Sequence, residues 1–332
     1  MRLATIKSAN GIVVGTILRS GEAYLDVQAA HVAMHGAPAA EFISMHDLIC
    51  ANDQGLDLAH SVVAWSEGRI EPTPLAEVTL LAPVPEPTQM RDALCFELHC
   101  VQAFNQAREL RIARAADPDA ERKELEERGL LQVPKEFYQF PLYYKQNRFS
   151  VSGPGTDVIW PRYSQVMDYE LELGIFIGKP GINIPRDQAL EHIYGYTIFN
   201  DFSARDALFA EWGGGLGPAK GKDFKGGHAV GPWIVTADEI GDPYSLEMVV
   251  RINGEERGRG NSSSIHWRFE DLIARITEEE DLRAGEFIGS GTVGNGSGLE
   301  LNHYLEHGDV VELEVEKIGI LRNRVLRPEL SA

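Results

Sequence analysis

Two glutamates, Glu170 and Glu172, stand two positions apart in the otherwise apolar segment 169–177. In a β-strand, residues i and i+2 point to the same face, so this spacing places both carboxylates side by side. Like charges that share a partly buried face repel each other and lose hydration, which is costly unless something compensates. A bound divalent cation is the simplest compensation, and the sequence therefore indicates a metal site.

A third carboxylate, Asp201, follows Asn200 at the end of the apolar segment 196–199. Beside the two glutamates it would complete an oxygen-rich site, which suits Mg²⁺, Ca²⁺ or Mn²⁺ better than Zn²⁺. Spacing alone leaves an alternative of equal weight. The glutamates could lie on a solvated face of a sheet, with Asp201 merely starting a helix.

The segment 289–294 reads Gly-Ser-Gly-Thr-Val-Gly and matches the dinucleotide-binding pattern literally. That pattern requires a helix to begin there, and the sequence Asn-Gly-Ser-Gly at 295–298 disfavours one. We therefore predict a glycine-rich turn that lets the backbone approach a ligand closely, rather than a nucleotide site.

Five separated motifs, taken in order, resemble those of the fumarylacetoacetate hydrolase family. The resemblance covers roughly residues 90–326 and implies an α+β fold. The fold would be a mostly antiparallel mixed β-sandwich roll of the family's C-terminal type, preceded by a small β-rich N-terminal domain. The motifs are Met-Asp-Tyr-Glu-Leu-Glu at 167–172, Asn-Asp-Phe-Ser-Ala-Arg-Asp at 200–206, Gly-Lys-Asp-Phe at 221–224 with Gly-Pro-Trp at 231–233, Gly-Ser-Gly-Thr at 289–292, and the tail at 308–323.

The resemblance implies a cation site with one more carboxylate than the spacing indicates. In this family an aspartate on the segment that enters the catalytic domain joins the E-x-E pair and the aspartate of the second motif. The implied ligands are Asp92, Glu170, Glu172 and Asp201, and the implied cofactor is Mg²⁺, Ca²⁺ or Mn²⁺.

The same resemblance implies a general base. The family's hydrolase places a histidine seven residues after the first metal-binding aspartate and pairs it with a late glutamate, and His99 and Glu300 hold these positions. Arg205 and Lys222 resemble the cationic residues that stabilise the oxyanion and the substrate carboxylate. The plainer alternatives are an ordinary helix-face histidine at His99, an ion pair between Arg205 and Asp206, and a solvated Lys222.

Further positions bear on the substrate. Tyr144 and Thr292 resemble substrate-contact residues, although Tyr144 could equally pack in the core. Leu208 stands where the eponymous hydrolase has a polar glutamine that helps to hold its substrate. Phe202 replaces the usual tryptophan, and Leu94 lies where a tyrosine contacts the substrate. These departures leave the identity of the substrate open.

The resemblance implies an enzyme of the class of hydrolases that act on carbon–carbon bonds in ketonic substances. The substrate would be a fumarylacetoacetate-like or acylpyruvate-like 2,4-dioxo acid, in the catabolism of aromatic compounds. The alternative is a decarboxylase, isomerase or hydratase that acts on a 2-oxo acid with the same metal, of the 2-hydroxyhepta-2,4-diene-1,7-dioate isomerase or oxaloacetate decarboxylase type. A non-catalytic binding protein is disfavoured because both His99 and Glu300 are present.

The elements that position these residues can be read from periodicity and turn signals. The proline-rich stretch 82–88 predicts a stiff linker, and therefore a small domain at 1–84 and a catalytic domain at 85–332. Short strands over 3–28 and a helix over 44–64 are expected in the first domain. In the second, helical patterning is read from 92 to about 128, with a charged insertion over about 103–137.

The rest of the chain is strand-rich. Ser203 and Asp206 have the spacing of a helix cap, another helix is expected at 268–278, and the last two strands predict a hairpin around Gly319. The predicted strands lie at 157–160, 169–178, 194–200, 228–236, 246–252, 286–293 and 309–325.

Composition excludes several classes of partner. The 332 residues are 43% hydrophobic and 24% charged, which is enough apolar material for an ordinary core. A formal net charge of −19 argues against nucleic acid, but it allows an anionic small molecule held by a local basic cluster. Three irregularly spaced cysteines and the lack of a long apolar stretch favour a cytoplasmic protein with no membrane partner. A homodimer is implied only by the resemblance.

Overall fold

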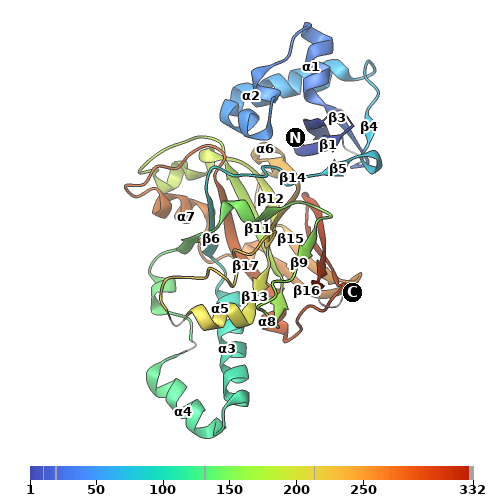
Figure 1. Cartoon of the computed structure of the whole chain (residues 1–332). Helices are drawn as coiled ribbons and strands as arrows, with labels where there is room; N and C mark the ends of the chain where they lie inside the picture. Colours follow the sequence, from blue (N-terminus) through green and yellow to red (C-terminus); the bar gives the residue numbers. More distant parts are fainter. Residues whose placement is uncertain (10, 19–20, 131, 213, 329–332) are drawn as a thin grey trace.

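The computed structural model describes residues 1–9, 11–18, 21–130, 132–212 and 214–328 (Figure 1). Within these residues the largest sheet is mixed and has 12 strands. Two of them are short side branches: β5 (Thr79–Leu80) pairs with β1, and β8 (Val151–Ser152) pairs with β14. The other strands lie, in spatial order, at β4 (Thr73–Pro74), β3 (Ala23–Asp26), β2 (Gly11–Ile17), β1 (Arg2–Ser8), β14 (His228–Thr236), β12 (Ile193–Asp201), β11 (Glu170–Ile177), β17 (Phe287–Ser297), β6 (Met90–Leu94) and β7 (Leu142–Lys145).

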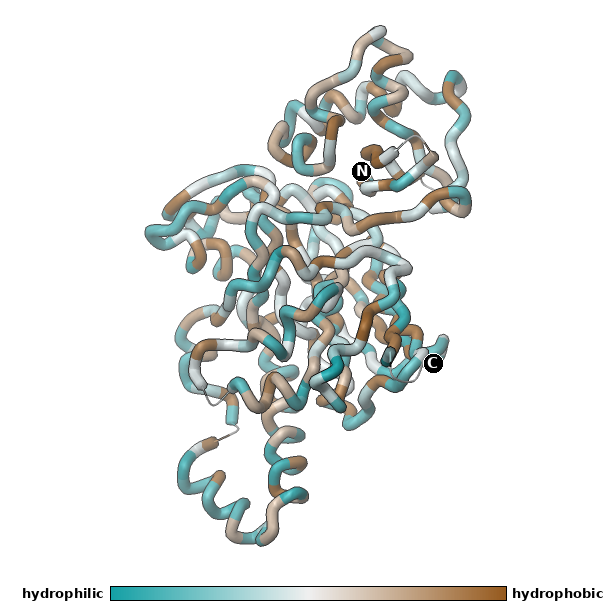
Figure 2. The backbone as a smooth tube through the Cα atoms, in the orientation of Figure 1, coloured by the Kyte–Doolittle hydropathy of each residue, from teal (hydrophilic) through white to brown (hydrophobic). Residues whose placement is uncertain are grey.

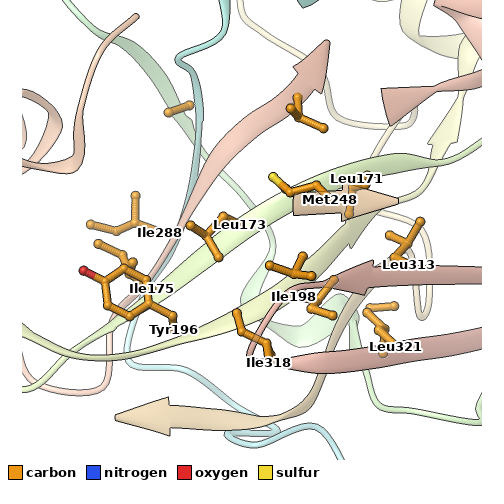
Figure 3. Close-up of a cluster of buried hydrophobic side chains, with 14 of the residues drawn as sticks. Leu171, Leu173, Ile175, Tyr196, Ile198, Met248, Ile288, Leu313, Ile318 and Leu321 are labelled. Atoms are coloured by element: carbon orange, nitrogen blue, oxygen red, sulfur yellow. The ribbon is translucent and has the colours of Figure 1, made fainter. Parts of the chain in front are cut away.

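A second sheet packs against one face of the first. Its order is β16 (Glu255–Asn261), β15 (Glu247–Ile252), β18 (Val310–Val315), β19 (Gly319–Leu326) and β9 (Asp157–Ile159). The main core lies between the two sheets, where Leu171, Leu173 and Ile175 of β11 meet Met248 and Leu313 (Figure 3). Because side chains alternate along a strand, Glu170 and Glu172 point to the opposite face of the large sheet.

The helices cover the large sheet and extend beyond it. Helices α1 (Val27–His35) and α2 (Met45–Ser66) share an apolar cluster with Phe176, Phe199 and Phe287 of the large sheet. Figure 1 shows α3 (Glu97–Arg114) and α4 (Pro118–Arg128) as a hairpin that projects from the body, and teal, hydrophilic residues predominate along α4 in Figure 2. No helix among the described residues is both long and apolar enough to cross a membrane.

The remaining elements are short. The α-helices are α5 (Arg205–Trp212), α6 (Ala237–Ile240), α7 (Phe269–Ile276) and α8 (Gly298–Leu301). The 3-10 turns are η1 (Ala40–Phe42), η2 (Leu75–Glu77), η3 (Lys135–Tyr138), η4 (Arg148–Ser150), η5 (Arg186–His192) and η6 (Ser262–Ser264). A small two-stranded ladder joins β10 (Met167–Asp168) to β13 (Ser203–Ala204).

Two local predictions about where helices begin are wrong. Segment 90–94 is a strand rather than the start of a helix, because it pairs in parallel with β17, with Asp92 opposite Gly289. Ser203 belongs to β13 and does not cap the next helix. The Asp206 carboxylate instead accepts hydrogen bonds from the Ser164 hydroxyl at 2.6 Å and the Gln165 amide at 2.7 Å. In both cases a partner distant in the sequence overrides a local signal.

The N-terminal segment is tied to the rest of the chain through the large sheet. Strand β1 pairs with β2 and β5 within the segment, and with β14 outside it. Alongside its short strands the segment holds the 22-residue helix α2. The domain boundary near residue 84 stays a prediction about how the chain divides into folding units.

Candidate active site

Three carboxylates meet on the face of the large sheet that points away from the second sheet. Asp92 comes from β6, Glu172 from β11 and Asp201 from the end of β12. All three are buried, and their oxygen atoms lie within 4.8 Å of one another. Strand β17 runs between β11 and β6, so the carboxylates of those strands meet across it.

Glycine in β17 makes this meeting possible. A Cβ atom at Gly289 would lie 2.6 Å from Asp92 Oδ1 and 2.8 Å from Glu172 Oε2, which is closer than real contacts allow. The backbone N–H of Gly291 donates to Glu172 Oε2 at 2.9 Å, and Gly291 has a φ of 77°. The segment lies within β17, which confirms the predicted strand at 286–293 and makes the predicted turn at 289–294 wrong. Close approach of the backbone is found there, against the carboxylates.

The three carboxylates of the cluster repel one another when they are ionised, and the protein groups around them only partly neutralise their charge. Burial and the charge of Asp201 raise the pKa of Asp92 to about 7. Burial and the neighbouring Asp92 raise the pKa of Glu172 well above its ordinary value. A buried set of oxygen donors with unfavourable mutual repulsion fits a hard divalent cation such as Mg²⁺, Mn²⁺ or Ca²⁺.

Glu170 contacts two buried basic side chains beside the cluster. The guanidinium of Arg205 donates to Glu170 Oε1 at 2.7 Å, and the Lys222 ammonium donates to both Glu170 and Asp201. Burial raises the pKa of Glu170, but the charges of Arg205 and Lys222 outweigh it and lower it below the ordinary value. The role of Glu170 as a fourth metal ligand stays a prediction.

The predicted base pair is also brought together. His99, on the first turn of α3, places Nδ1 3.2 Å from Oε1 of the fully buried Glu300, although without the angle of a regular hydrogen bond. The Glu300 carboxylate is fixed because it accepts from the Asn295 amide at 3.1 Å and the Ser297 amide at 2.8 Å. Burial lowers the pKa of His99, but the Glu300 charge more than reverses this and raises it.

A cavity of about 270 Å³, the inner cavity, collects the predicted residues. Asp201 lies behind its wall, where its Oδ2 accepts from the Tyr144 hydroxyl at 3.0 Å, and Glu300 lies behind His99. Apolar side chains such as Leu94, Leu142 and Leu208 form the remaining wall. The predicted residues that line the cavity are Asp92, His99, Tyr144, Glu170, Glu172, Arg205, Leu208, Lys222 and Thr292.

The sequence analysis did not identify Asp168, which connects Arg205 to the short helix that carries Glu300. Its buried carboxylate accepts from Arg205 Nε at 2.7 Å. It also accepts from the amides of Gly298 and Leu299 at 2.8 and 2.9 Å, in the short helix that carries Glu300. The signal was present, because Asp168 stands two positions before Glu170 and continues the same alternation.

His228 was missed as well. It is fully buried on β14, with Nδ1 2.9 Å from Asp201 Oδ1 and Nε2 3.1 Å from Asp223 Oδ1. Burial lowers the pKa of His228, but hydrogen bonds to Asp201 and Asp223 raise it above the ordinary value. Asp201 is thereby fixed from behind while Lys222 contacts it from the cavity. No spacing in the sequence connects His228 to Asp201.

Asp168→Asn tests the first of these contacts. We expect kcat/KM to fall by about 10–100-fold, because Arg205 loses a charge-assisted hydrogen bond worth about 1.5–3 kcal/mol. Steady-state kinetics would measure the loss. Asp157→Asn is the matched control, since Asp157 forms a two-bond pair with Arg324 on the surface at 2.9 and 2.7 Å. Equal kinetics for both variants would remove Asp168 from the site.

Comparison with known proteins places this site in a family. The family model described as fumarylacetoacetate (FAA) hydrolase C-terminal matches residues 115–326. The chain belongs to the fumarylacetoacetate hydrolase family. The human mitochondrial oxaloacetate tautomerase FAHD2A is 32% identical over 254 residues, which cover 76% of this chain and 71% of the relative.

Two more relatives in this family carry different activities in their names. The 2,4-didehydro-3-deoxy-L-rhamnonate hydrolase of Sphingomonas sp. (strain SKA58) is 35% identical over 198 residues, which cover 59% of this chain and 67% of the relative. The crystal structure of 5-carboxymethyl-2-hydroxymuconate delta-isomerase from Mycobacterium smegmatis is 26% identical, with a TM-score of 0.66, and covers 98% of this chain and 100% of that one. The predicted family and α+β fold are confirmed, and relatives with such a fold include both hydrolases and isomerases.

Proposed function

We propose that this protein is a metal-dependent hydrolase that cleaves a carbon–carbon bond in an acylpyruvate-like or fumarylacetoacetate-like 2,4-dioxo acid. One observation carries the proposal. A histidine paired with a buried glutamate opens onto the same small cavity as the carboxylate cluster and two buried basic side chains, Arg205 and Lys222. Asp92, Glu172 and Asp201 would hold the divalent cation, with Glu170 beside them.

The bound cation would supply polarisation of the substrate's carbonyl oxygens. His99 takes a proton from water, with Glu300 stabilising the imidazolium that forms, and the hydroxide attacks the C-4 carbonyl. Arg205 and Lys222 stabilise the oxyanion, each by about 3–4 kcal/mol when well placed. When the oxyanion collapses, the C-3–C-4 bond breaks, and the products are a carboxylic acid and an enolate that takes a proton at C-3.

A second candidate is an isomerase, in the sense of a tautomerase, that acts on a 2-oxo acid. The same histidine could move a proton between carbon and oxygen without adding water. The inner cavity is compatible with this reaction because apolar side chains such as Leu94, Leu142 and Leu208 line it beside His99. Relatives named as a tautomerase and an isomerase support it as well.

Isotope labelling separates the two candidates. Acylpyruvates, fumarylacetoacetate and oxaloacetate would be incubated with the protein and Mg²⁺ or Mn²⁺ in ¹⁸O-water, and the products read by mass spectrometry. Hydrolysis splits the substrate into two acids, one of which carries solvent ¹⁸O in its new carboxylate, whereas tautomerisation gives a single product whose composition changes only by exchange of keto oxygen with solvent. Release of CO₂ or a single uncleaved product with every dioxo acid would refute the hydrolase proposal.

A further inference from the structure

A second cavity, the outer pocket, adjoins the inner cavity and has a volume of about 870 Å³. It lies between the α3–α4 hairpin and α5, elements that Figure 1 shows at the same end of the molecule. Arg205 and Trp212 line both cavities. The proposed reaction uses only the inner cavity, so the larger space beside it has no role there.

Two helices run from one cavity to the other. On α5, Leu208 faces the inner cavity and Phe209 the outer pocket. On α3, His99 faces the inner cavity, and Arg111 and Arg114 face the outer pocket. His99 and Arg114 are fifteen positions apart on α3, which is roughly 22 Å at 1.5 Å per residue. A ligand that lies along α3 can therefore reach from the base to these arginines.

The outer pocket has an apolar middle. Phe104 and Trp212 contact each other with ring centroids 5.3 Å apart, and Trp212 stacks on Phe209 at 6.1 Å. Ala107 and Leu110 of α3 add aliphatic surface to the same wall. This lining suits an alkyl chain or an aromatic ring and offers few partners to a polar one.

The charged part of the outer pocket is basic. Its lining includes four arginines and two carboxylates, but Arg205 is already paired with Asp168 and Glu170 outside the pocket. Arg111 pairs with Glu121 at 2.7 Å and Arg128 with Glu124 at 2.6 Å, and these pairs involve α4. Burial raises the pKa of Tyr304, and the nearby charge of Arg114 opposes this rise. Within the described part of the chain Arg114 is the one arginine of this lining without an ion pair, and its charge favours an anionic occupant.

We propose that the outer pocket binds the distal arm of the substrate, an apolar alkyl or aromatic chain that ends in a carboxylate. The dioxo head would occupy the inner cavity, the chain would pass Trp212, and its carboxylate would meet Arg114. This inference rests on the proposed function for the head group. It predicts a substrate larger than the inner cavity alone could hold.

The test compares two dioxo acids. One is acetylpyruvate, and the other carries at C-4 an alkyl chain long enough to span about 22 Å of helix and ends in a carboxylate. We expect kcat/KM to favour the long acid by about tenfold or more, from burial of its chain. Arg114→Ala should lower that ratio about tenfold, because a charge-assisted hydrogen bond is lost. Ala107→Phe, which fills the pocket, should lower it as well.

A matched control comes from the same helix. Arg108 lies on α3, bonds Asn105 at 3.4 Å and does not line the pocket, so Arg108→Ala should keep the wild-type ratio. A long dicarboxylic acid without the dioxo head tests binding apart from turnover. It should quench tryptophan fluorescence in the wild type, and the quenching should be lost in Trp212→Phe and weakened in Arg114→Ala.

The outcomes separate this inference from the proposed function. Quenching that depends on Arg114, without turnover of any dioxo acid, would uphold the outer pocket and refute the hydrolase. Turnover of both acids with equal kcat/KM would uphold the hydrolase and overturn the outer pocket. An unchanged ratio in Arg114→Ala together with a changed molecular mass by light scattering would also overturn it, since the pocket would then be a contact between copies of the chain.

Discussion

His99→Ala should lower kcat/KM for the dioxo acid by about 10²–10⁴-fold, the usual contribution of a positioned general base. His99 opens onto the inner cavity and contacts Glu300 at 3.2 Å, but it does not belong to the carboxylate cluster. The affinity for Mg²⁺ should therefore stay at the wild-type value. Steady-state kinetics at saturating Mg²⁺ and isothermal titration calorimetry would measure the two quantities separately.

The partner and a control sharpen this prediction. Glu300 raises the pKa of His99, so Glu300→Gln should move the acidic limb of the pH–rate profile to lower pH and reduce kcat. His303→Ala is the control, since His303 is an exposed histidine just after the short helix that carries Glu300. Unchanged turnover in His99→Ala would show that another group activates the water.

The second large effect concerns the stability of the metal-free protein. The pKa of Asp92 rises from 3.8 to about 7 on folding, so the folded state binds more protons than the unfolded state between these values. With a chelator present, the free energy of unfolding should fall as pH rises from about 4 to about 7, by on the order of 4 kcal/mol. Denaturant titrations at the two ends of this range would measure the loss.

Addition of Mg²⁺ and one substitution identify the source of that loss. Mg²⁺ should restore the free energy of unfolding at neutral pH, because the cation offsets the repulsion between the carboxylates. Asp92→Asn should be more stable than the wild type with chelator at pH 7, and should gain little from Mg²⁺. The raised pKa values of Glu172, Asp168, His99 and His228 act in the same direction, so only the difference between Asp92→Asn and the wild type reports on Asp92. A full Mg²⁺ response in Asp92→Asn would contradict the assignment.

Much of the site could be predicted because its residues carry local signals. The alternation of Glu170 and Glu172 defines one face of a strand, and the resemblance supplies the spacing from Asp92 to His99. The structure gathers these side chains around one cavity. Their individual roles stay predictions, because a shared cavity does not by itself assign chemistry.

What the sequence did not reveal depends on contacts between distant segments. Segment 90–94 directly precedes α3, and its pairing with β17 and β7 makes it a strand. His228 reaches Asp201 across the ladder of β12 and β14, where the two residues are paired in register. The outer pocket has no local signature, since it exists only where the hairpin of α3 and α4 faces α5.

The order of strands around the carboxylates has a kinetic consequence. Buried Arg91 of β6 pairs with Glu286, which directly precedes β17 and lies 195 positions further along the chain. In the sheet, β17 separates β6 from β11. Such distant segments meet only after a long loop has closed, so the like charges are far apart and hydrated until β17 inserts. A divalent cation would therefore favour the native state over the unfolded chain by mass action. Departure of β17 would have to release the cation, so raising its concentration should prolong the lifetime of the folded protein.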